Sequence, residues 1–219
     1  MSQEDTGKVI ILQPSDATAK ITDVVEGIIS GIMENGEVNV VGLSDSIFLA
    51  CSALNMATEI AKVYIDDIDI ASLNMPVIGK VSAVSAHLSQ KHAGDYSALS
   101  EKEDKSMTEV TEQTISVSRS ATMERLLTIT LLRLAKYDEI KIVAAGGSIN
   151  DAISLALKLA NGQISKDAVG IKLFYLHSII MRNDPTKSIA AVSIYLHKGL
   201  TTRYTKRQSA VLKKVESGI

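Results

Sequence analysis

An internal repeat is the feature that most constrains how this chain can fold. The segment "VNVVGLSDSIFLACSALNMA" (38–57) aligns without a gap over "IKIVAAGGSINDAISLALKL" (140–159), at an offset of 102 residues. Two shorter matches flank it in the same order: 15–18 with 119–122 at an offset of 104, and 83–90 with 191–198 at an offset of 108. Three ordered matches indicate two copies of one domain within the 219 residues.

Each copy alternates between the period of a strand and that of a helix. The strands expected in the first copy are 8–13, 37–43, 62–72 and 77–88, and its helices are 16–36 and 46–61. The second copy repeats this with strands at 114–118, 139–145, 169–180 and 188–198, and helices at 121–137 and 148–160. We therefore expect an α/β chain of two tandem β-α-β-α-β-β domains. Each is an α+β two-layer sandwich, with a mixed sheet and helices on one face.

The domain boundaries follow from composition and charge. Residues 7–92 carry five Lys and Arg against ten Asp and Glu, whereas residues 112–198 carry eleven against seven. A polar segment, 93–111, separates the two copies and has the composition of a linker. The tail, 199–219, holds five basic residues against one acidic residue, with a short helix expected around 210–215. An acidic first domain and a basic second domain and tail predict that a polyanion would bind the second.

Composition narrows the protein class further. The chain is 46% hydrophobic and 22% charged, as in globular proteins with a sizeable core. Its apolar runs are too short to span a membrane. Cys51 is the only cysteine, so we expect no internal disulfide and a reducing, cytoplasmic compartment. Its place inside an apolar helix predicts a core residue.

The paired glycine in "AAGGSINDAISLALKLANG" (144–162) resembles the start of a phosphate-binding loop. It lacks both GxGxxG and GxxxxGK[ST], and Asp151 would repel a phosphate at the start of the following helix. The simpler interpretation is a tight strand-to-helix turn, with Ser148 as the N-cap of the helix and Asp151 completing a capping box.

No catalytic, cofactor or metal site is predicted. The four histidines have no metal-ligand spacing on one helix, and we expect them on strand surfaces. Asp66, Asp67 and Asp69 alternate along a strand, so Asp67 and Asp69 should share one face with Asp66 opposite. A solvated strand face explains them better than a cation site, because no other ligand run accompanies them.

The basic residues of the second copy and tail are the candidates for function. Arg119 sits at the first strand-to-helix junction, and "MRNDPTK" (181–187) places two cations on a hairpin turn. Charge on a hairpin tip and a tail is typical of phosphate contact, although an ordinary solvated surface is nearly as good an explanation. The candidate cations after Arg119 are Arg182, Lys187, Lys198, Arg203, Lys206 and Arg207.

The segment "TISVSRSATMERLLTITLLRLAKYDEIKIVAAGGSINDAISLALKL", with the strand "VSIYLHKG", resembles an Alba domain. Alba proteins are small dimeric DNA- and RNA-binding proteins of archaeal chromatin, with eukaryotic relatives in RNA processing. The resemblance covers most of 112–198 and extends more faintly to 7–92. It implies a β-α-β-α-β-β fold and pairing of two domains, which here would form an intramolecular pseudo-dimer.

The resemblance also implies nucleic-acid contact at three places. The first strand–helix junction falls on Arg119 and Ser120 in the second copy, and near Pro14 and Ser15 in the first. The second junction, where the family carries arginines, falls on 145–147 and on 43–45, which hold none. The hairpin arm falls on 182–187 and should shrink to "NMP" (74–76) in the first copy.

These observations lead to three hypotheses. The first is an Alba-type protein that binds DNA or RNA through its second domain and tail, with the first domain as a built-in dimer partner. The second is a scaffold whose acidic first domain binds another protein. The third, an enzyme or small-molecule binder, rests only on scattered Asp and His residues.

Overall fold

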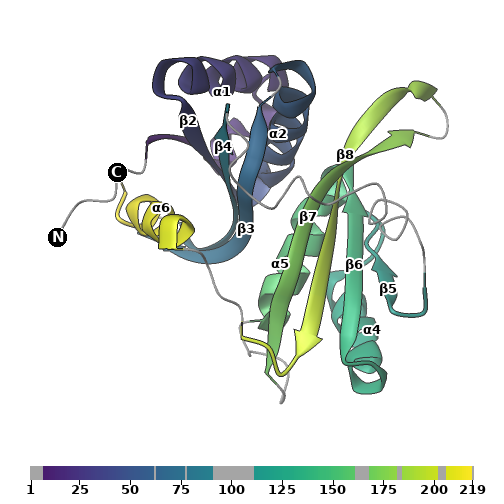
Figure 1. Cartoon of the computed structure of the whole chain (residues 1–219). Coiled ribbons are helices and arrows are strands. Elements are labelled where there is room, and N and C mark those ends of the chain that lie inside the picture. The colour runs from purple at the N-terminus through teal and green to yellow at the C-terminus, as the bar shows by residue number, and fades with distance from the viewer. Residues whose placement is uncertain are drawn as a thin grey trace. The chain divides into compact units, whose positions relative to one another are not determined.

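A computed structural model describes residues 7–61, 63–76, 78–90, 111–160, 168–181, 184–201 and 206–218 (Figure 1). The chain divides into two compact units, one containing residues 1–100 together with 204–219, the other containing 101–203. The first unit is therefore built from both ends of the sequence.

The first unit holds a four-stranded sheet in the order β1-β2-β4-β3. Strands β1 and β2 are parallel, because α1 crosses between them, and the other pairs are antiparallel. The elements are β1 (Lys8–Leu12), α1 (Ile21–Asn35), β2 (Glu37–Leu43), α2 (Ile47–Ala61), β3 (Tyr64–Met75) and β4 (Gly79–Ser89), with 3-10 turns at Pro14–Thr18 and Ser44–Ser46.

The second unit repeats this topology, with the sheet order β5-β6-β8-β7. Its elements are β5 (Thr114–Ser116), α4 (Met123–Lys136), β6 (Glu139–Ala145), a 3-10 turn at Gly146–Ser148, α5 (Ile149–Ala160), β7 (Val169–Met181) and β8 (Asp184–Lys198). The predicted β-α-β-α-β-β order is confirmed in both units. The 3-10 turn leads directly into α5, so Ser148 is not the separate N-cap that the sequence suggested.

The strand register reproduces the offsets of the sequence repeat. Val38 lies opposite Leu88 in the first sheet, and Ile140 lies opposite Leu196 in the second. Val38 and Ile140 are 102 residues apart, and Leu88 and Leu196 are 108 residues apart, the same offsets that align the two copies in the sequence. The two units therefore share strand pairing as well as strand order.

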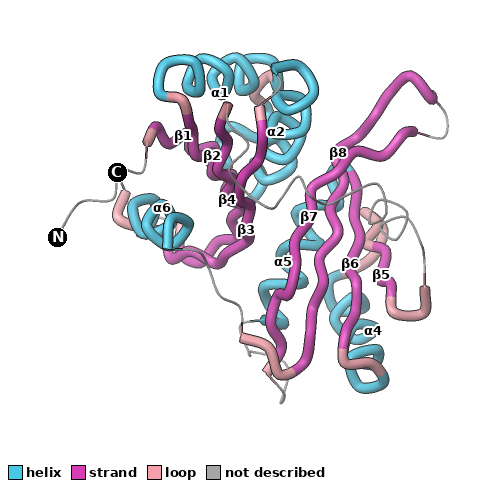
Figure 2. The backbone as a smooth tube through the Cα atoms, viewed as in Figure 1, coloured by secondary structure: helices cyan, strands magenta, loops and turns pink. Residues whose placement is uncertain are grey.

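In each unit two helices cover one face of the sheet (Figure 2). Ile28 and Ile32 of α1 are fully buried, and Gly42 of β2 lies so close to α2 that a Cβ there would be 2.5 Å from that of Ala50. Cys51 lies in this core as predicted, and desolvation by burial raises the pKa of its thiol to about 12.

A third helix, α6 (Lys206–Glu216), packs on the opposite face of the first sheet (Figure 1). The predicted tail helix thus exists, but it closes a second core rather than standing apart. That core contains Val211, Leu212 and Val215 of α6 with Val41, Leu43, Ala71, Leu73 and Ala83 of the sheet. Asn74 N–H donates to Glu216 Oε1 at 2.9 Å, and Ser85 Oγ donates to Gln208 Oε1.

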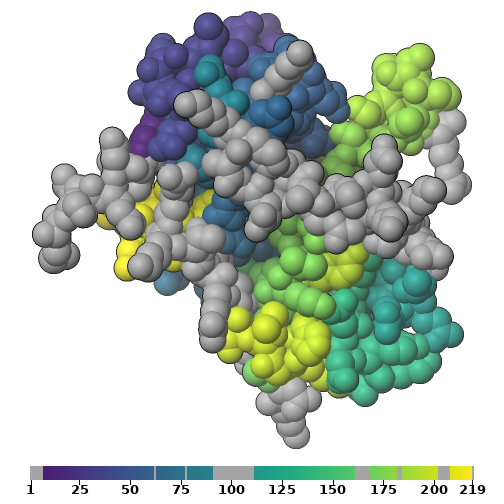
Figure 3. Space-filling view, in the orientation of Figure 1, coloured from purple at the N-terminus to yellow at the C-terminus, as the bar shows by residue number. Residues whose placement is uncertain are grey.

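Both units extend a two-stranded arm beyond the rest of the sheet. In the second unit β6 pairs with β8 only over 191–197, whereas β7 and β8 pair on to Met181 and Asp184. Side chains of this arm project in yellow-green at the upper right of Figure 3. In the first unit β3 and β4 pair as far as Met75 and Gly79. The first arm is shorter than the second, since β4 has 11 residues and β8 has 15. It does not shrink to residues 74–76 alone, because β3 and β4 still pair over 72–75 and 79–82, and Met75 packs against the core under α6.

Candidate nucleic-acid interface

The first strand–helix junction of the second unit spans residues 117–122. Ala121 N–H donates to the Ser118 carbonyl at 3.0 Å, which turns the chain. Thr122 then caps α4, accepting a hydrogen bond from Arg125 N–H at 3.4 Å. This geometry leaves Arg119 and Ser120 exposed at the turn, as required of residues that contact a ligand.

The guanidinium of Arg119 lies against Gly147, in the second strand–helix junction. A Cβ at position 147 would lie 2.4 Å from Nη2 of Arg119 and 2.8 Å from its Nε. Only glycine leaves room for this placement. The preceding Gly146 has a different role, because its φ of +58° is left-handed and favours glycine. The paired glycine therefore turns the chain and makes space for a cation.

A pocket of about 260 Å³ lies beside this junction. One part of its wall carries hydroxyl and guanidinium groups, and another part is aliphatic. The lining residues are Thr114, Ile115, Ser116, Ser118, Ser120, Ala121, Arg125, Leu126, Ile129 and Arg133. Arg133 is held in place because its Nη1 donates to the Thr114 carbonyl.

The basic side chains of the second unit differ in whether they already form ion pairs with carboxylates. Within the described ranges, the guanidinium groups of Arg119 and Arg125 have no hydrogen-bond or ion-pair partner. Lys187 Nζ, in contrast, lies 2.8 Å from Asp184, whose pKa is lowered by that hydrogen bond and by Thr186. Lys198 Nζ lies 3.6 Å from Asp138. The two arginines are thus the more available anion ligands.

The structure brings together only part of the predicted set. Arg119 and Ser120 meet at the junction, whereas Lys187 and Lys198 lie at opposite ends of β8, about 36 Å apart along the strand at 3.3 Å per residue. Arg182 and Arg203 lie outside the described residues. Lys206 and Arg207 begin α6 in the first unit, and their side chains are also outside the description.

Sequence reasoning missed Arg125, Arg133, Ser116 and Ser118. A signal was present, because Ser116, Ser118 and Ser120 recur at every second position, which places alternate side chains on one side of an extended chain. The two arginines are separated by about two helical turns of α4, a spacing that sets them along one side of the helix.

The matching junction of the first unit is closed by its own hydrogen bonds. Gln13 N–H donates to Asp16 Oδ2 at 2.8 Å, and Ser46 Oγ donates to the Gln13 carbonyl. Ser44 takes the left-handed φ of Gly146, at +49°, and Asp45 stands where the second unit has Gly147. This junction presents carboxylates, which repel a phosphate.

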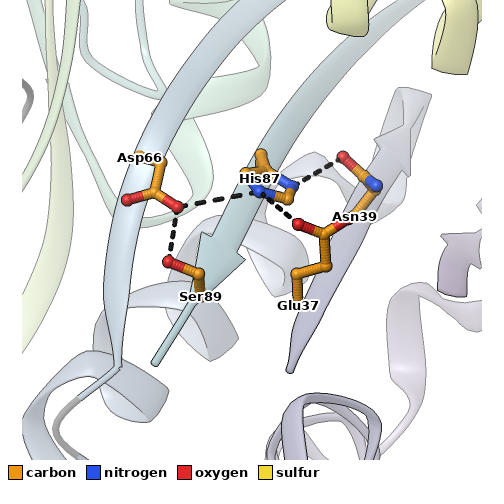
Figure 4. Close-up of polar contacts among 5 residues, drawn as sticks. All are labelled: Glu37, Asn39, Asp66, His87 and Ser89. Atoms are coloured by element: carbon orange, nitrogen blue, oxygen red, sulfur yellow. Dashed lines mark hydrogen bonds and ion pairs between the residues drawn. The ribbon is translucent and has the colours of Figure 1, made fainter. Parts of the chain in front are cut away.

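The outer face of the first sheet holds a buried polar cluster (Figure 4). His87 is only 1% exposed, and its Nδ1 lies 3.2 Å from Asn39 Oδ1. Its Nε2 lies 3.5 Å from Glu37 Oε2 and 3.6 Å from Asp66 Oδ2, and Ser89 Oγ donates to Asp66 at 2.6 Å. The prediction of a surface histidine was wrong here, because neighbouring polar groups compensate its burial.

The placement of the aspartates also differs from the prediction. A bulge between Ile65 and Asp67 turns Asp66 toward His87, so Asp66 does not face away from Asp67. Asp69 is half-buried rather than solvated. Desolvation, and secondarily the charge of Asp67, raise the pKa of Asp69 to about 7.

Two other kinds of site are absent from the described residues. No group of three or more His, Cys, Asp or Glu side chains is arranged there to hold a metal ion. None of the helices in that part of the chain is long and apolar enough to cross a membrane.

Similarity to known proteins is found among solved structures. No family model matches the sequence, and no curated protein matches it. Among solved structures, the chain is similar to the crystal structure of ALBA1 from Trypanosoma brucei. The match has 16% identity and a TM-score of 0.35, and it covers 50% of this chain and 84% of that one. At that score the similarity assigns no function.

Proposed function

We propose that this protein is an Alba-type nucleic-acid-binding protein that contacts phosphates of DNA or RNA through its second unit. The observation that carries the proposal is the guanidinium of Arg119 resting on Gly147. A cation from the first junction thereby occupies the second junction, where the resembling family carries arginines. Arg125 adds a second guanidinium in the wall of the pocket, which Ser118 and Ser120 of the same junction also line.

Charge and hydrogen-bonding chemistry support this function. Guanidinium groups without a carboxylate partner bind phosphate oxygens through charge-assisted hydrogen bonds. The surplus of basic over acidic residues in 112–198 attracts a polyanion, whereas the acidic surplus of 7–92 does not. Lys187 and Lys198 form the outer contacts of the second unit in this proposal. The tail cations Arg203, Lys206 and Arg207 add to them, although the last two begin α6 in the first unit.

A salt-dependent titration tests the proposal directly. The full chain is titrated into labelled duplex DNA, duplex RNA and hairpin RNA at several salt concentrations. We expect binding at low salt that weakens by about one unit of logarithmic slope per phosphate contact. The same measurement on Arg119→Gln and Arg125→Gln should lower the slope. Absence of binding to all three nucleic acids at low salt would rule out this function.

A second candidate function rests on the acidic outer face of the first sheet. Glu37, Asp67 and Asp69 bring three partly exposed carboxyl groups onto strands that carry no basic junction, whereas Asp66 is turned inward toward His87. Such a surface suits a basic segment of another protein. Affinity purification with the chain and with an Asp67→Asn, Asp69→Asn variant tests this. A protein partner lost only with the variant supports it, and recovery of nucleic acid alone contradicts it.

We also propose that the two units pair within one chain. The identical topology and register give each unit the surfaces that a symmetric dimer of this fold would use. Paired units should relax as one body in NMR. Separately tumbling units would contradict the pairing without affecting the binding proposal.

A further inference from the structure

The pocket beside the Arg119 junction is a hollow lined by residues of β5, of the junction and of α4. A phosphate backbone contacts proteins through surface cations and loops, whereas a concave site admits a group that projects from the strand. The pocket measures about 260 Å³, slightly below the range of about 300–1,000 Å³ for small-molecule sites. Its capacity is therefore that of one small ligand, or of one residue of a polymer.

The wall of the pocket joins two kinds of chemistry. Ser118 and Ser120 place their hydroxyl oxygens 3.2 Å apart, and Arg125 adds a guanidinium without a partner among the described residues. The aliphatic part comes from Ile115, Leu126 and Ile129. A simple anion would use only the first part, whereas a ligand with an anionic end and a flat apolar body would use both.

We propose that this pocket binds a single unpaired nucleoside monophosphate unit, with its phosphate toward Arg125, Ser118 and Ser120 and its base against the aliphatic wall. The inference deepens the proposed function, on which it rests. It predicts that the protein prefers a strand with an unstacked nucleotide, such as a bulge, loop or end, over a fully paired duplex. Single-stranded loops and bulges offer bases that can enter a pocket, and paired bases do not.

The first unit shows what the pocket requires. Its matching junction is occupied by the Gln13–Asp16 and Ser46–Gln13 hydrogen bonds, and it presents carboxylates instead of arginines. The two units therefore share a fold but only the second carries this chemistry. A ligand bound in this pocket should therefore shift the NMR signals of residues 114–133 and leave those of the first unit unchanged.

The experiment uses the full chain and two kinds of probe. In the first arm, AMP, adenosine and inorganic phosphate are titrated while backbone NMR shifts of residues 114–133 are followed. In the second arm, binding is compared between a paired RNA hairpin and the same hairpin with one bulged nucleotide, with AMP as competitor. AMP should shift the pocket residues more than phosphate at equal concentration, and the bulged hairpin should bind about tenfold more tightly.

Variants separate the pocket from general charge. Arg125→Gln and Ser118→Leu change exposed groups, so the fold should persist, and both should remove the bulge preference. Lys136→Gln is the matched control, because it removes one positive charge from the same helix at a lysine outside the pocket that is paired with Glu112. It should retain the preference.

The outcomes distinguish this inference from the proposed function. Equal binding of paired and bulged hairpins, with no AMP response, overturns the pocket inference and leaves nucleic-acid binding intact. Equal shifts with phosphate and AMP also overturn it, because the ligand is then an anion without a base. AMP binding without any preference for the bulged hairpin overturns the inference that the pocket binds a nucleotide of a nucleic-acid strand. Pocket shifts with AMP, but no binding of either RNA or DNA at low salt, support the nucleotide pocket and refute the proposed function.

Discussion

Arg119 and Gly147 form a contact that only glycine permits, with the guanidinium of one occupying the space of the missing side chain of the other. The contact joins two strand–helix junctions that are separated along the sequence by α4 and β6. It explains why a turn that lacks arginines of its own still presents a positive charge.

Substitution of Gly147 by alanine should displace Arg119 with little effect on the fold. The backbone at 147 is not left-handed, and the clashing atoms belong to the end of a flexible side chain. We expect Gly147→Ala to lower the salt slope of nucleic-acid binding by about one unit, as Arg119→Gln does. The double variant should lose no more than either single one, because both remove the same contact.

Gly146→Ala is the contrasting control in that experiment. Its left-handed φ alone costs a residue with a side chain about 1–2 kcal/mol, and a Cβ there would lie 2.7 Å from Ile189. Thermal melts should show a loss of stability for Gly146→Ala and near wild-type stability for Gly147→Ala. Equal destabilisation of both would contradict the roles assigned to the two glycines.

Removal of the Asp184 carboxylate should strengthen binding through the arm. Lys187 is paired with Asp184, so nucleic acid must compete for that ammonium group. Asp184→Asn retains an oxygen that can accept from Thr186 but frees the lysine. We expect the salt slope, measured by fluorescence anisotropy, to increase in Asp184→Asn and to decrease in Lys187→Gln, so that the two variants differ by about one unit. An unchanged slope in Asp184→Asn would mean that the arm does not contact phosphate.

Truncation of Leu212 should destabilise the first unit. Leu212 is buried in the core between α6 and the sheet, so Leu212→Ala removes apolar contacts and leaves a cavity. We expect a loss of about 2–5 kcal/mol, seen as faster amide hydrogen exchange in β2, β3 and β4. Lys213→Ala, at the exposed neighbouring position, should change stability by no more than about 0.5 kcal/mol. Equal protection in both variants would place α6 outside the cooperative core.

The raised pKa of Asp69 predicts a pH dependence of stability. Because folding raises this pKa from 3.8 to about 7, the folded state binds the proton more tightly than the unfolded state. Stability contributed by Asp69 is therefore gained as pH falls through about 7 and becomes constant below the unfolded pKa. Asp69→Asn should remove this dependence, so its advantage in melting temperature over the wild type should grow between about pH 5 and pH 8. A difference in melting temperature between Asp69→Asn and the wild type that stays constant across that pH range would contradict this prediction.

The periodicity of the apolar residues was enough to predict both sheets and the four helices that cover them. Val38 and Ile140 are both fully buried, as their places in the apolar pattern of β2 and β6 predict. The role of Cys51 followed from the same pattern. Local pattern therefore determines the elements of this fold.

Contacts between distant segments could not be predicted in this way. The burial of His87 depends on carboxylates from two other strands, and a one-residue bulge decides where Asp66 points. The docking of α6 on Val41 and Leu73 joins the end of the chain to its beginning. The Arg119–Gly147 contact likewise depends on the missing Cβ of Gly147, and the pattern of apolar residues does not predict such a contact.

The docking of α6 also bears on the order in which the protein is made. The first sheet is synthesised before the second unit, but one of its cores lacks Val211, Leu212 and Val215 until α6 has been made after that unit. Domains generally fold as units, in the order of their synthesis. Here the second unit has all of its strands before the first unit has all of its core. Of the two units, the one whose synthesis starts first is therefore the one that is completed last.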